Sequence, residues 1–517
     1  MNKAITSIVV VGGGTAGWIT AGRIAAMHCT EHSPISVTLV ESATVPTVGV
    51  GEGTWPTMRS TLMKLGIRES DFIRECEASF KQGAKFAKWV DGSDDDFYYH
   101  PLVLPQGFGA TDLAGHWQTK AFNIASKPSF SNAVCYQETL CEHGLAPKTI
   151  RQAQYNGTAN YAYHLDAGKF TQFLHKHCTS KLKVKHIYDD ITSVKSAENG
   201  DIAAVVGKTT GEITGDLFID CSGFQSLLLG QHYQVPFIGC EDVLFIDRAL
   251  AVQVPYDTPD APIATHTIST GQDAGWIWDI GLQQRRGVGY VYSSRHSNEE
   301  HALQRLADYV GPTFTQLSVK KIPIKSGRRS HFWHKNCVAV GLSAGFLEPL
   351  EASALVLVEL SAQMIAEQLP ACRSIMGNVA KRFNQTFDYR WDRIIDFLKL
   401  HYMLSKRTDS DFWIDNRRDE SIPESLKEML EIWRYHPPGD HDFTSNNEVF
   451  PAASYQYVLY GMGFETDTRF IEHRLKDSEF AMGQLQQNQH NIQQVLRTLP
   501  KHRDLLDKIN QYGFQSI

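Results

Sequence analysis

The chain has 517 residues, of which 42% are hydrophobic and 21% are charged, a composition that excludes a mainly disordered protein. The 50 basic and 57 acidic side chains leave a net charge of −7 without a basic run, so we expect no nucleic-acid partner. The nine cysteines include no Cys-x-x-Cys pair, and no apolar run reaches the roughly 18 residues that cross a bilayer. These patterns predict a cytoplasmic protein without a membrane segment or a signal peptide.

The first segment has the pattern of a dinucleotide-binding unit. Residues 5–11 are nearly all apolar and mostly β-branched, which is typical of a strand buried in a parallel sheet. Gly12, Gly14 and Gly17 follow on the G-x-G-x-x-G frame, and an alanine-rich helix is expected over 19–27. Glycines let the backbone approach a pyrophosphate, whose charge the free N–H groups at the helix start stabilise. A tight turn without a ligand is the alternative.

Two later segments extend this unit. Residues 35–41 predict a second strand ending at Glu41, near the spacing at which a carboxylate meets the ribose hydroxyls of a dinucleotide. Residues 216–223 predict another buried strand, of the kind that returns the chain to the cofactor in FAD-binding folds. An ordinary strand that ends in a turn has the same pattern and is the alternative. No second glycine fingerprint follows a strand, so we expect one dinucleotide site and no nicotinamide domain.

Four further stretches, together with the glycine loop, resemble the flavin-dependent halogenases of the tryptophan halogenase family. They are VGVGEGTWP at 48–56, SFKQGAKFAKW at 79–89, GWIWDIGL at 275–282 and GLSAGFLEPLEASAL at 341–355. The third is similar to the family's Trp-x-Trp-x-Ile-Pro signature, which implies that Trp276 and Trp278 form an active-site wall; Gly281 stands where proline is usual. Flavin hydroxylases generally lack this tryptophan pair.

The resemblance implies the fold and the domains. We expect an α/β protein with a doubly wound, Rossmann-like FAD-binding fold of the flavin monooxygenase type and a mostly helical C-terminal subdomain on the substrate side. The FAD-binding module, with interleaved substrate-side sheet segments, is placed at 1–375, and the helical subdomain covering the substrate site at 376–517. Aromatic and aliphatic residues at helical spacings over 387–404 favour this helical assignment. A homodimer is one option for the assembly.

The resemblance also implies the residues that bind the cofactor, FAD in its reduced form FADH2. They are Gly12, Gly14, Thr15, Ala16, Gly17, Glu41, Gly49, Val50, Gly51, Glu52 and Leu342. The glycine-rich backbone at 48–56 can lie flat against an isoalloxazine, and the family uses this strap between the flavin and substrate sites. By composition alone, a loop without a ligand is the alternative.

Lys81 is the first candidate catalytic residue. The spacing of Phe72, Ile73, Cys76 and Phe80 predicts an amphipathic helical turn that ends at Lys81, where a lysine can simply interact with the helix C-terminus. The resemblance implies instead that Lys81 captures or orients hypohalous acid (HOX), as a haloamine or through a hydrogen bond. Burial can lower the pKa of a lysine by as much as 3–5 units, which would suit the haloamine route.

Glu351 is the second candidate. A turn of small residues at 341–345 leads through Glu351 into an apolar helix expected from about 353 to 369. Free N–H groups at that helix start suit a halide, with Ser353 and Ala354 as backbone donors. The resemblance implies that Glu351 positions the halogenating agent or takes a proton from the substrate; otherwise it only favours the helix dipole. The family's Glu-Ser-Thr-Gly turn reads Glu-Ala-Ser-Ala here, which bears on halide binding and on the choice of chloride or bromide.

The residues expected to bind the substrate differ from the pattern of the family. In the family, a histidine and an aromatic partner sandwich an indole; here His100 remains, but the partner position holds Leu102. The stretch 446–463 offers Phe450 without an adjacent second ring, so a neutral indole, a phenol or a larger ligand carrying one is favoured over free tryptophan. A core histidine is the alternative for His100. Histidine pairs elsewhere lack a third ligand at a recognised spacing, so we expect no metal site.

The implied reaction is FADH2- and O2-dependent halogenation, with chloride or bromide, of an electron-rich aromatic such as an indole or phenol. HOX formed at the flavin would pass to Lys81 and Glu351, and a separate flavin reductase would supply FADH2. A tunnel would keep the ring from the flavin, so that only the small oxidant passes. The alternatives are an aromatic hydroxylase with its substrate beside the flavin, and a flavin-binding protein without halogenating activity.

Overall fold

The computed structural model describes residues 3–44, 51–119, 128–445 and 448–514. The chain divides into two compact units, each assembled from three separate segments. The first unit contains Met1–Ala78, Leu165–Cys240 and Lys325–Asp392, and the second contains Ser79–His164, Glu241–Ile324 and Arg393–Ile517. The predicted division into 1–375 and 376–517 concerns cofactor and substrate roles and stays a proposal.

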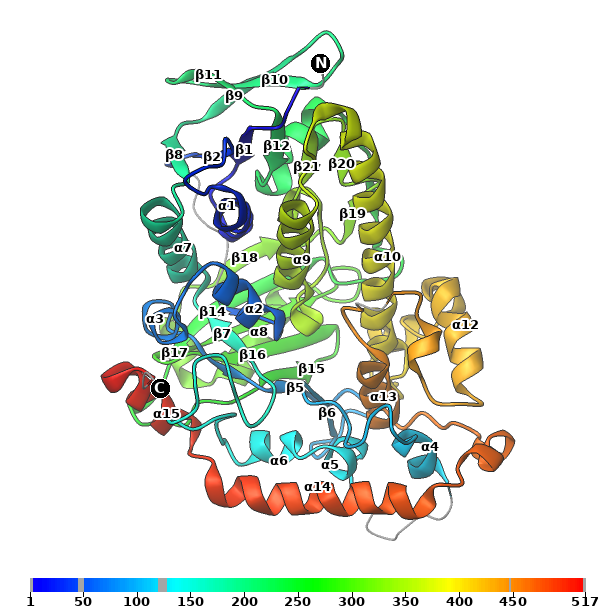
Figure 1. The fold of residues 1–517 in the computed structure, drawn as a ribbon. Coiled ribbons are helices and arrows are strands. Elements are labelled where there is room, and N and C mark those ends of the chain that lie inside the picture. Colours follow the sequence, from blue (N-terminus) through cyan, green and yellow to red (C-terminus); the bar gives the residue numbers. More distant parts are fainter. Residues whose placement is uncertain (1–2, 45–50, 120–127, 446–447, 515–517) are drawn as a thin grey trace. The chain divides into compact units, whose positions relative to one another are not determined.

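The first unit is built on a six-stranded sheet (Figure 1). Its strands, in spatial order, are β20 (Trp333–His334), β21 (Cys337–Ala339), β12 (Leu217–Asp220), β1 (Ser7–Val11), β2 (Ser36–Glu41) and β8 (Lys185–Tyr188). All neighbours are parallel except β20 and β21. Because β1 and β12 are almost entirely apolar and buried, they have the sequence of strands covered on both faces.

Three helices of this unit pack together. Helix α1 (Thr15–His28) packs against α7 (Ala167–Lys181) and α9 (Ser353–Glu367), and Figure 1 shows it lying between them. The strand, helix, second strand and returning strand predicted from the sequence are therefore confirmed. The smaller elements of the unit are β3 (Glu52–Gly53), α2 (Thr57–Lys64), α3 (Glu69–Glu75), the antiparallel sheet β11 (Gly211–Thr214), β10 (Ile202–Gly207), β9 (Ile191–Ser196), and the antiparallel sheet β13 (Phe237–Gly239), β19 (Gly327–Arg329), β22 (Gly345–Phe346).

The second unit contains a seven-stranded sheet that is antiparallel except for its β15–β5 pair. Its strands are β18 (Lys320–Pro323), β14 (Arg248–Pro255), β17 (Arg285–Tyr292), β16 (Gly275–Gly281), β15 (Thr267–Gly271), β5 (Gly83–Ala87) and β6 (Phe97–Pro101). Alternate apolar residues, among them Leu250, Ile277 and Tyr290, form a core with Ala302 and Leu306 of helix α8 (Glu299–Val310). A separate short ladder pairs β4 (Ser79–Lys81) with β7 (Ala162–Leu165).

The C-terminal part of the chain is helical, as predicted. Helix α10 (Met376–Met403) begins in the first unit and ends in the second. It is followed by α11 (Asp411–Asp415), α12 (Glu424–Trp433), α13 (Ala452–Gly461), α14 (Ser478–Thr498) and α15 (His502–Tyr512). Helix α13 packs on β6, and α14 packs on α5 (Phe130–Val134); α4 (Leu113–Gln118) and α6 (Gln137–Glu142) complete the unit. The predicted mixed α/β architecture with a helical C-terminal region is confirmed.

One local prediction is wrong. The turn that leads to Lys81 is not helical up to that residue, because α3 ends at Glu75 and Ser79–Lys81 forms strand β4. The apolar residues at 76 and 80 also suit a short buried strand, and pairing with β7 decides between the two structures.

Candidate active site

The glycine loop between β1 and α1 is shaped for close approach of a ligand. Gly12 has φ +116°, and a Cβ there would lie 2.1 Å from the carbonyl oxygen of Cys221. A Cβ at Gly17 would lie 1.9 Å from the carbonyl oxygen of Gly12, so neither position accepts a side chain. Gly14, the N-cap of α1, faces open space and offers no side-chain cap. The loop therefore fits a pyrophosphate bound at the first N–H groups of α1.

Two more predicted cofactor residues lie at the start of α1. Gly341 has φ +74°, and a Cβ there would lie 2.7 Å from Cβ of Ala16. The short turn Gly341–Ser343, which contains Leu342, therefore lies against the first turn of α1. Thr15 is held by a hydrogen bond of 3.0 Å between its hydroxyl and that of Thr171. These contacts gather the 341–343 turn and the glycine loop in one place, as a single cofactor site requires.

Glu41 lies directly beside the glycine loop. A Cβ at Gly13 would be only 1.6 Å from Oε2 of Glu41, so the carboxyl group lies against the loop backbone. Its Oε1 is 2.8 Å from Nε2 of His186, but not in hydrogen-bond geometry. Burial raises the pKa of Glu41 to about 7 and lowers the pKa of His186 to about 4, so the two groups do not form a strong ion pair. Glu41 therefore lies at the glycine loop, where a ribose contact was predicted for it.

The strap is described only in its second half. Gly49 and Val50 lie outside the described residues. Gly51 is half-buried, and Glu52 begins β3, where burial raises the pKa of its carboxyl group to about 7. Trp55, at the end of the strap, donates a hydrogen bond of 2.7 Å from its indole N–H to the backbone oxygen of Glu351. The strap therefore ends in direct contact with the turn that carries the candidate catalytic glutamate.

The turn at Glu351 has an unusual backbone. Glu351 has φ 61° and Ala352 has φ 53°, both in the left-handed region that non-glycine residues seldom adopt. Helix α9 starts immediately afterwards, at Ser353, and its N-cap Ala352 provides no side-chain cap. Ser353 is buried and Ala354 is exposed. The predicted helix is confirmed, and its uncapped first N–H groups suit an anion.

Lys81 is buried in the second unit, with 2% of its surface exposed. On the β4–β7 ladder Lys81 lies opposite Ala162, and Ser79 lies opposite His164, so Lys81 and His164 are diagonal neighbours on one face. Burial, and then the charge of Lys81, hold the pKa of His164 well below its usual value. A neutral histidine therefore lies beside the lysine, and it adds no positive charge to this buried region.

The two signature tryptophans share one face of β16. Trp276 donates a hydrogen bond of 2.9 Å to the hydroxyl of Tyr402 and lies 6.2 Å, between ring centroids, from Trp89. Trp278 covers the backbone of Gly289 on the neighbouring strand, where a Cβ would lie 2.1 Å from its ring. The pair is therefore fixed on this face by the strand alternation and by close packing.

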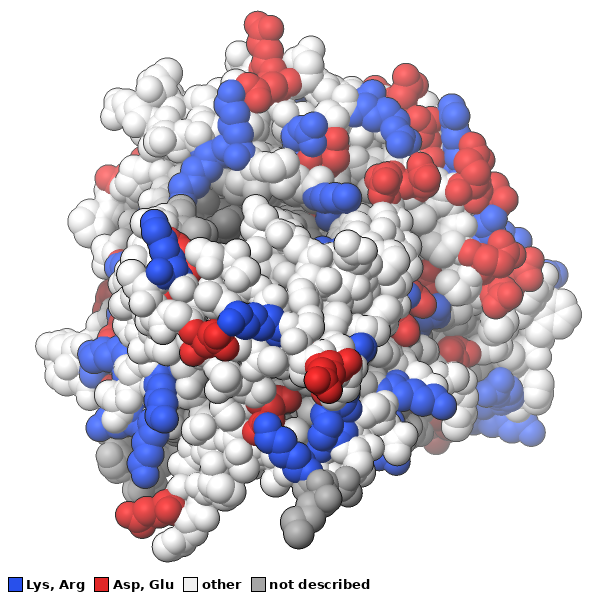
Figure 2. All heavy atoms as spheres, turned by 90° about the horizontal axis from the view of Figure 1, so that it is seen from above, with Lys and Arg blue, Asp and Glu red and all other residues white. Residues whose placement is uncertain are grey.

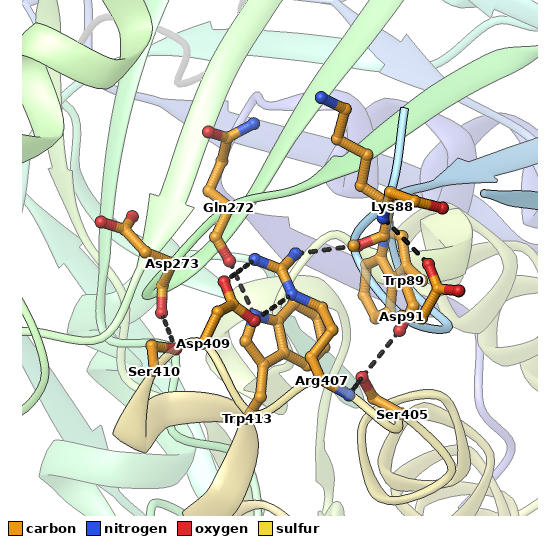
Figure 3. Close-up of polar contacts among 12 residues, drawn as sticks. Lys88, Trp89, Asp91, Gln272, Asp273, Ser405, Arg407, Asp409, Ser410 and Trp413 are labelled. Carbon is orange, nitrogen blue, oxygen red and sulfur yellow. Dashed lines mark hydrogen bonds and ion pairs between the residues drawn. The ribbon is translucent and has the colours of Figure 1, made fainter. Parts of the chain in front are cut away.

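A polar network holds the neighbouring tryptophans in place (Figure 3). Arg407 is bound by the carboxylate of Asp409, donates 2.8 Å to the backbone oxygen of Lys88, and lies 4.6 Å above the ring of Trp413. Trp413 donates to the backbone oxygen of Gln272, and Ser405 donates to that of Trp89. The loop after α10 is thereby anchored to the strand ends that carry the aromatic cluster.

The predicted substrate residues meet in a ring cluster of the second unit. His100, on β6, has its ring centroid 5.6 Å from Phe397, 6.4 Å from Phe450 and 6.2 Å from Tyr457. Phe397 and Phe450 are stacked with centroids 3.9 Å apart. Leu102 lies just beyond β6, where its N–H donates 2.7 Å to the side-chain oxygen of Gln137. The structure thus brings His100 and Phe450 together.

Comparison with known proteins identifies the family. A family model described as tryptophan halogenase matches residues 7–474. The chain belongs to the tryptophan halogenase family. A crystal structure of tryptophan halogenase from Shewanella frigidimarina NCIMB 400 is 49% identical, with a TM-score of 0.95 and coverage of 100% of this chain and 99% of that chain.

Other similar proteins are also named as tryptophan halogenases. Tryptophan 6-halogenase SttH from Streptomyces toxytricini is 33% identical over 88% of this chain and 89% of its own. The structure of Tar14, a tryptophan C-6 flavin-dependent halogenase (chlorinase) from taromycin biosynthesis, is 30% identical, with a TM-score of 0.90 and coverage of 98% and 99%. This member of the tryptophan halogenase family is therefore an enzyme, a flavin-dependent halogenase, as the sequence motifs predicted.

For three residues of this halogenase the sequence predicted no specific contact, and the structure shows one. Phe397 belongs to an aromatic stripe typical of a helix core, and only folding reveals that it stacks on Phe450. The indole N–H of Trp55 bonds to Glu351, far along the chain, and His164 lies beside Lys81 across the β4–β7 ladder. No local sequence pattern signals such pairings.

Further features of the described residues bear on partners. None of the helices there is both long and apolar enough to cross a membrane. Nor do three histidine, cysteine, aspartate or glutamate side chains gather there as they would around a metal ion. On the face drawn in Figure 2, lysines and arginines are interspersed with acidic residues.

Proposed function

We propose that this halogenase uses FADH2, O2 and chloride or bromide to halogenate an electron-rich ring such as an indole or phenol. Bound FADH2 supplies, with oxygen, the oxidising equivalents that convert halide and a proton into HOX and water. The ring then exchanges a proton for the halogen and releases a second water. The observation that best supports this chemistry is the burial of Lys81, a residue type that is seldom buried without a function or a partner.

The protein's own groups have separate tasks in this proposal. The glycine loop, Glu41 and the Gly341–Ser343 turn hold the FAD, and the first N–H groups of α9, at Ser353 and Ala354, hold the halide. Lys81 holds the oxidant, through a hydrogen bond from Nζ or as a haloamine, in a place where bulk water is excluded. Glu351 takes the proton that the ring loses.

The substrate proposal rests on the ring cluster and on the residue that is missing from it. The stacked pair Phe397 and Phe450 lies with His100 in a buried aromatic cluster, and aromatic rings pack favourably against one another. Leu102 stands where the family has an aromatic partner, and we therefore propose a neutral indole or a phenol, alone or within a larger ligand. The relatives are named for tryptophan, so tryptophan is the reference compound. A separate flavin reductase delivers the FADH2.

A product assay tests the proposal. The protein is incubated with FAD, a flavin reductase, NADH, oxygen and bromide, together with tryptophan, indole or phenol, and the products are analysed by mass spectrometry. We expect the bromine isotope doublet, with a lower KM for indole or phenol than for tryptophan. A product that gains only oxygen would establish the hydroxylase alternative. Tight FAD binding without any product from a broad ring panel would favour a flavin-binding role.

Two variants connect the product to the site. E351Q should bind FAD normally and slow bromination by about 100-fold, because an amide cannot take the ring proton. H100A should raise the KM for the ring substrate and leave FAD affinity unchanged, because its ring lies in the aromatic cluster. Wild-type rates in E351Q would remove Glu351 from the mechanism.

A further inference from the structure

A single buried hydrogen bond joins the end of the strap to the turn at Glu351. The donor is the indole N–H of Trp55, and the acceptor is the backbone oxygen of Glu351, 2.7 Å away and 296 positions along the chain. Only 8% of Trp55 is exposed, so water does not compete freely for this carbonyl. Both residues belong to the first unit.

The accepting carbonyl lies at the centre of a strained turn. Its peptide group links Glu351, with φ 61° and ψ 10°, to Ala352, with φ 53° and ψ 40°. Two successive non-glycine residues in the left-handed region persist only where their surroundings hold them. Because ψ of the first residue and φ of the second set the plane of the shared peptide, a hydrogen bond to its oxygen restrains both residues.

The donor is itself held against helix α9. Two residues after Trp55, helix α2 begins, and its Thr57 and Thr61 hydroxyls donate to the two carboxyl oxygens of Glu359, at 3.1 Å and 2.5 Å. Glu359 lies in α9, the helix that follows the turn, and is 2% exposed. The segments after Trp55 and after Glu351 are thus fastened together, which fixes the indole relative to the carbonyl.

We propose that Trp55 is a positioning residue for halogenation. Its N–H holds the Glu351–Ala352 peptide in the left-handed form, and so sets the direction of the Glu351 side chain and of the first N–H groups of α9. The inference rests on the proposed role of Glu351. It makes the strap, which contains Trp55, a structural determinant of the proposed catalytic carboxylate as well as a neighbour of the flavin.

The decisive variant is W55F, which keeps a ring in the core and removes the donor. We expect kcat for bromination to fall roughly tenfold, as for loss of one buried hydrogen bond, while the FAD Kd and the ring-substrate KM change less than twofold. In the double variant W55F/A352G, kcat should be at least threefold higher than in W55F, because glycine adopts the left-handed region without strain. An unchanged kcat in W55F, or no return in the double variant relative to A352G alone, would overturn the proposal.

Hydrogen exchange gives a readout that does not depend on activity. In the protein without added flavin, W55F should speed amide exchange at the start of α9, in peptides covering residues 350–356, and not at its C-terminal end. S361A is the matched control: it removes another buried hydrogen bond of α9, from the Ser361 hydroxyl to the backbone oxygen of Leu357, and should leave kcat and exchange at 350–356 unchanged. Equal effects of the two variants would show general loosening and refute the specific role of Trp55.

The experiment separates this inference from the proposed function. If the wild-type protein brominates its substrate and E351Q does not, the function stands whatever W55F does. Should W55F be insoluble, 3-benzothienylalanine at position 55 removes the N–H while keeping the shape of the ring, and the same tenfold loss of kcat is expected. A fully active isostere would refute the role of the hydrogen bond.

Discussion

Lys81 has a setting that its neighbours in sequence do not indicate. At the end of a helical turn it would lie near solvent and helix carbonyls, whereas on β4 it is buried beside the neutral ring of His164. A buried ammonium group is costly unless it is bonded or used, and a second positive charge nearby would increase that cost. The ladder therefore places the Lys81 side chain in a buried region beside a neutral histidine.

Replacing Lys81 by methionine tests whether this group is used. K81M should bind FAD as before and lose bromination by at least about 100-fold, because methionine can neither hold HOX nor form a haloamine. K85M, on the neighbouring strand, makes the same chemical change at a lysine paired with Glu142 and should keep its activity. Equal activity of both variants would exclude Lys81.

The raised pKa of Glu41 predicts that cofactor binding depends on pH. Its pKa is raised to about 7 by burial, so it is mostly protonated at pH 6 and ionised at pH 8, where it accepts hydrogen bonds from ribose hydroxyls best. The FAD Kd should rise by up to about tenfold from pH 8 to pH 6. His186, with a pKa lowered to about 4, stays neutral over this range. Fluorescence titration should show this step in wild type and not in E41Q; the same step in E41Q would assign it elsewhere.

At the scale of elements, helices α2 and α9 are joined through one buried carboxyl group. Glu359 accepts from Thr57 and Thr61, and burial raises its pKa to about 8. At neutral pH the group is therefore mostly protonated. Since the same pair of helices flanks Trp55 and the Glu351 turn, the protonation of Glu359 affects the stability of the region that carries the candidate glutamate.

The sign of the pH effect follows from the direction of this shift. A carboxyl group whose pKa is higher in the folded than in the unfolded chain stabilises the fold at low pH, and this contribution is lost as the pH rises from about 4.5 through 8. E359Q keeps a neutral side chain, so its unfolding free energy should match wild type at pH 5 and exceed it by roughly 1–3 kcal/mol at pH 8.5. Urea unfolding at both pH values measures this difference; a constant difference would contradict the shift.

The loop after α10 depends on one buried arginine. Arg407, 6% exposed, is bonded to Asp409 and to the backbone of Lys88 and stacks on Trp413, so R407A should lower the unfolding free energy by about 1–3 kcal/mol. Arg469 offers a matched control, because it makes the same two-oxygen contact with Asp467 on the surface. R469A should leave the unfolding midpoint unchanged. Similar losses in both variants would show that burial is not the cause.

At the scale of the whole molecule, each unit is assembled from segments far apart in sequence. Long chain excursions must therefore close before either core is complete, and a fragment that ends at residue 375 lacks part of both units. The division into cofactor and substrate roles consequently has to be tested in the full chain and not by truncation.

Hydrogen exchange with and without FAD tests this division. FAD should protect amides of the glycine loop and α1 and those of the Gly341–Ser343 turn, because ligand binding suppresses local opening at its site. Peptides of α14 should exchange at the same rate in both samples. Protection spread equally over 376–517 would contradict the assignment of cofactor binding to residues 1–375.

Much of the fold was predictable from short-range patterns. The apolar run of β1, the glycine loop, α1 and Glu41 follow one another within about forty residues, and each depends on local conformational preferences and on burial by adjacent elements. The start of α9 after the small-residue turn was predictable for the same reason. Lys81 was misassigned because the apolar residues at 76 and 80 suit a helical turn and a short buried strand equally well.

The sequence by itself determined the chemistry available to this protein: a dinucleotide loop, a lysine, a glutamate and a helix start, together with their membership in one family. Tertiary structure alone decided which groups meet, as Trp55 does with the carbonyl of Glu351 and Phe397 with Phe450. The reason is physical, because local preferences act over a few residues, whereas such contacts join distant segments and form only when burial of the whole core outweighs the entropy of closing the chain between them.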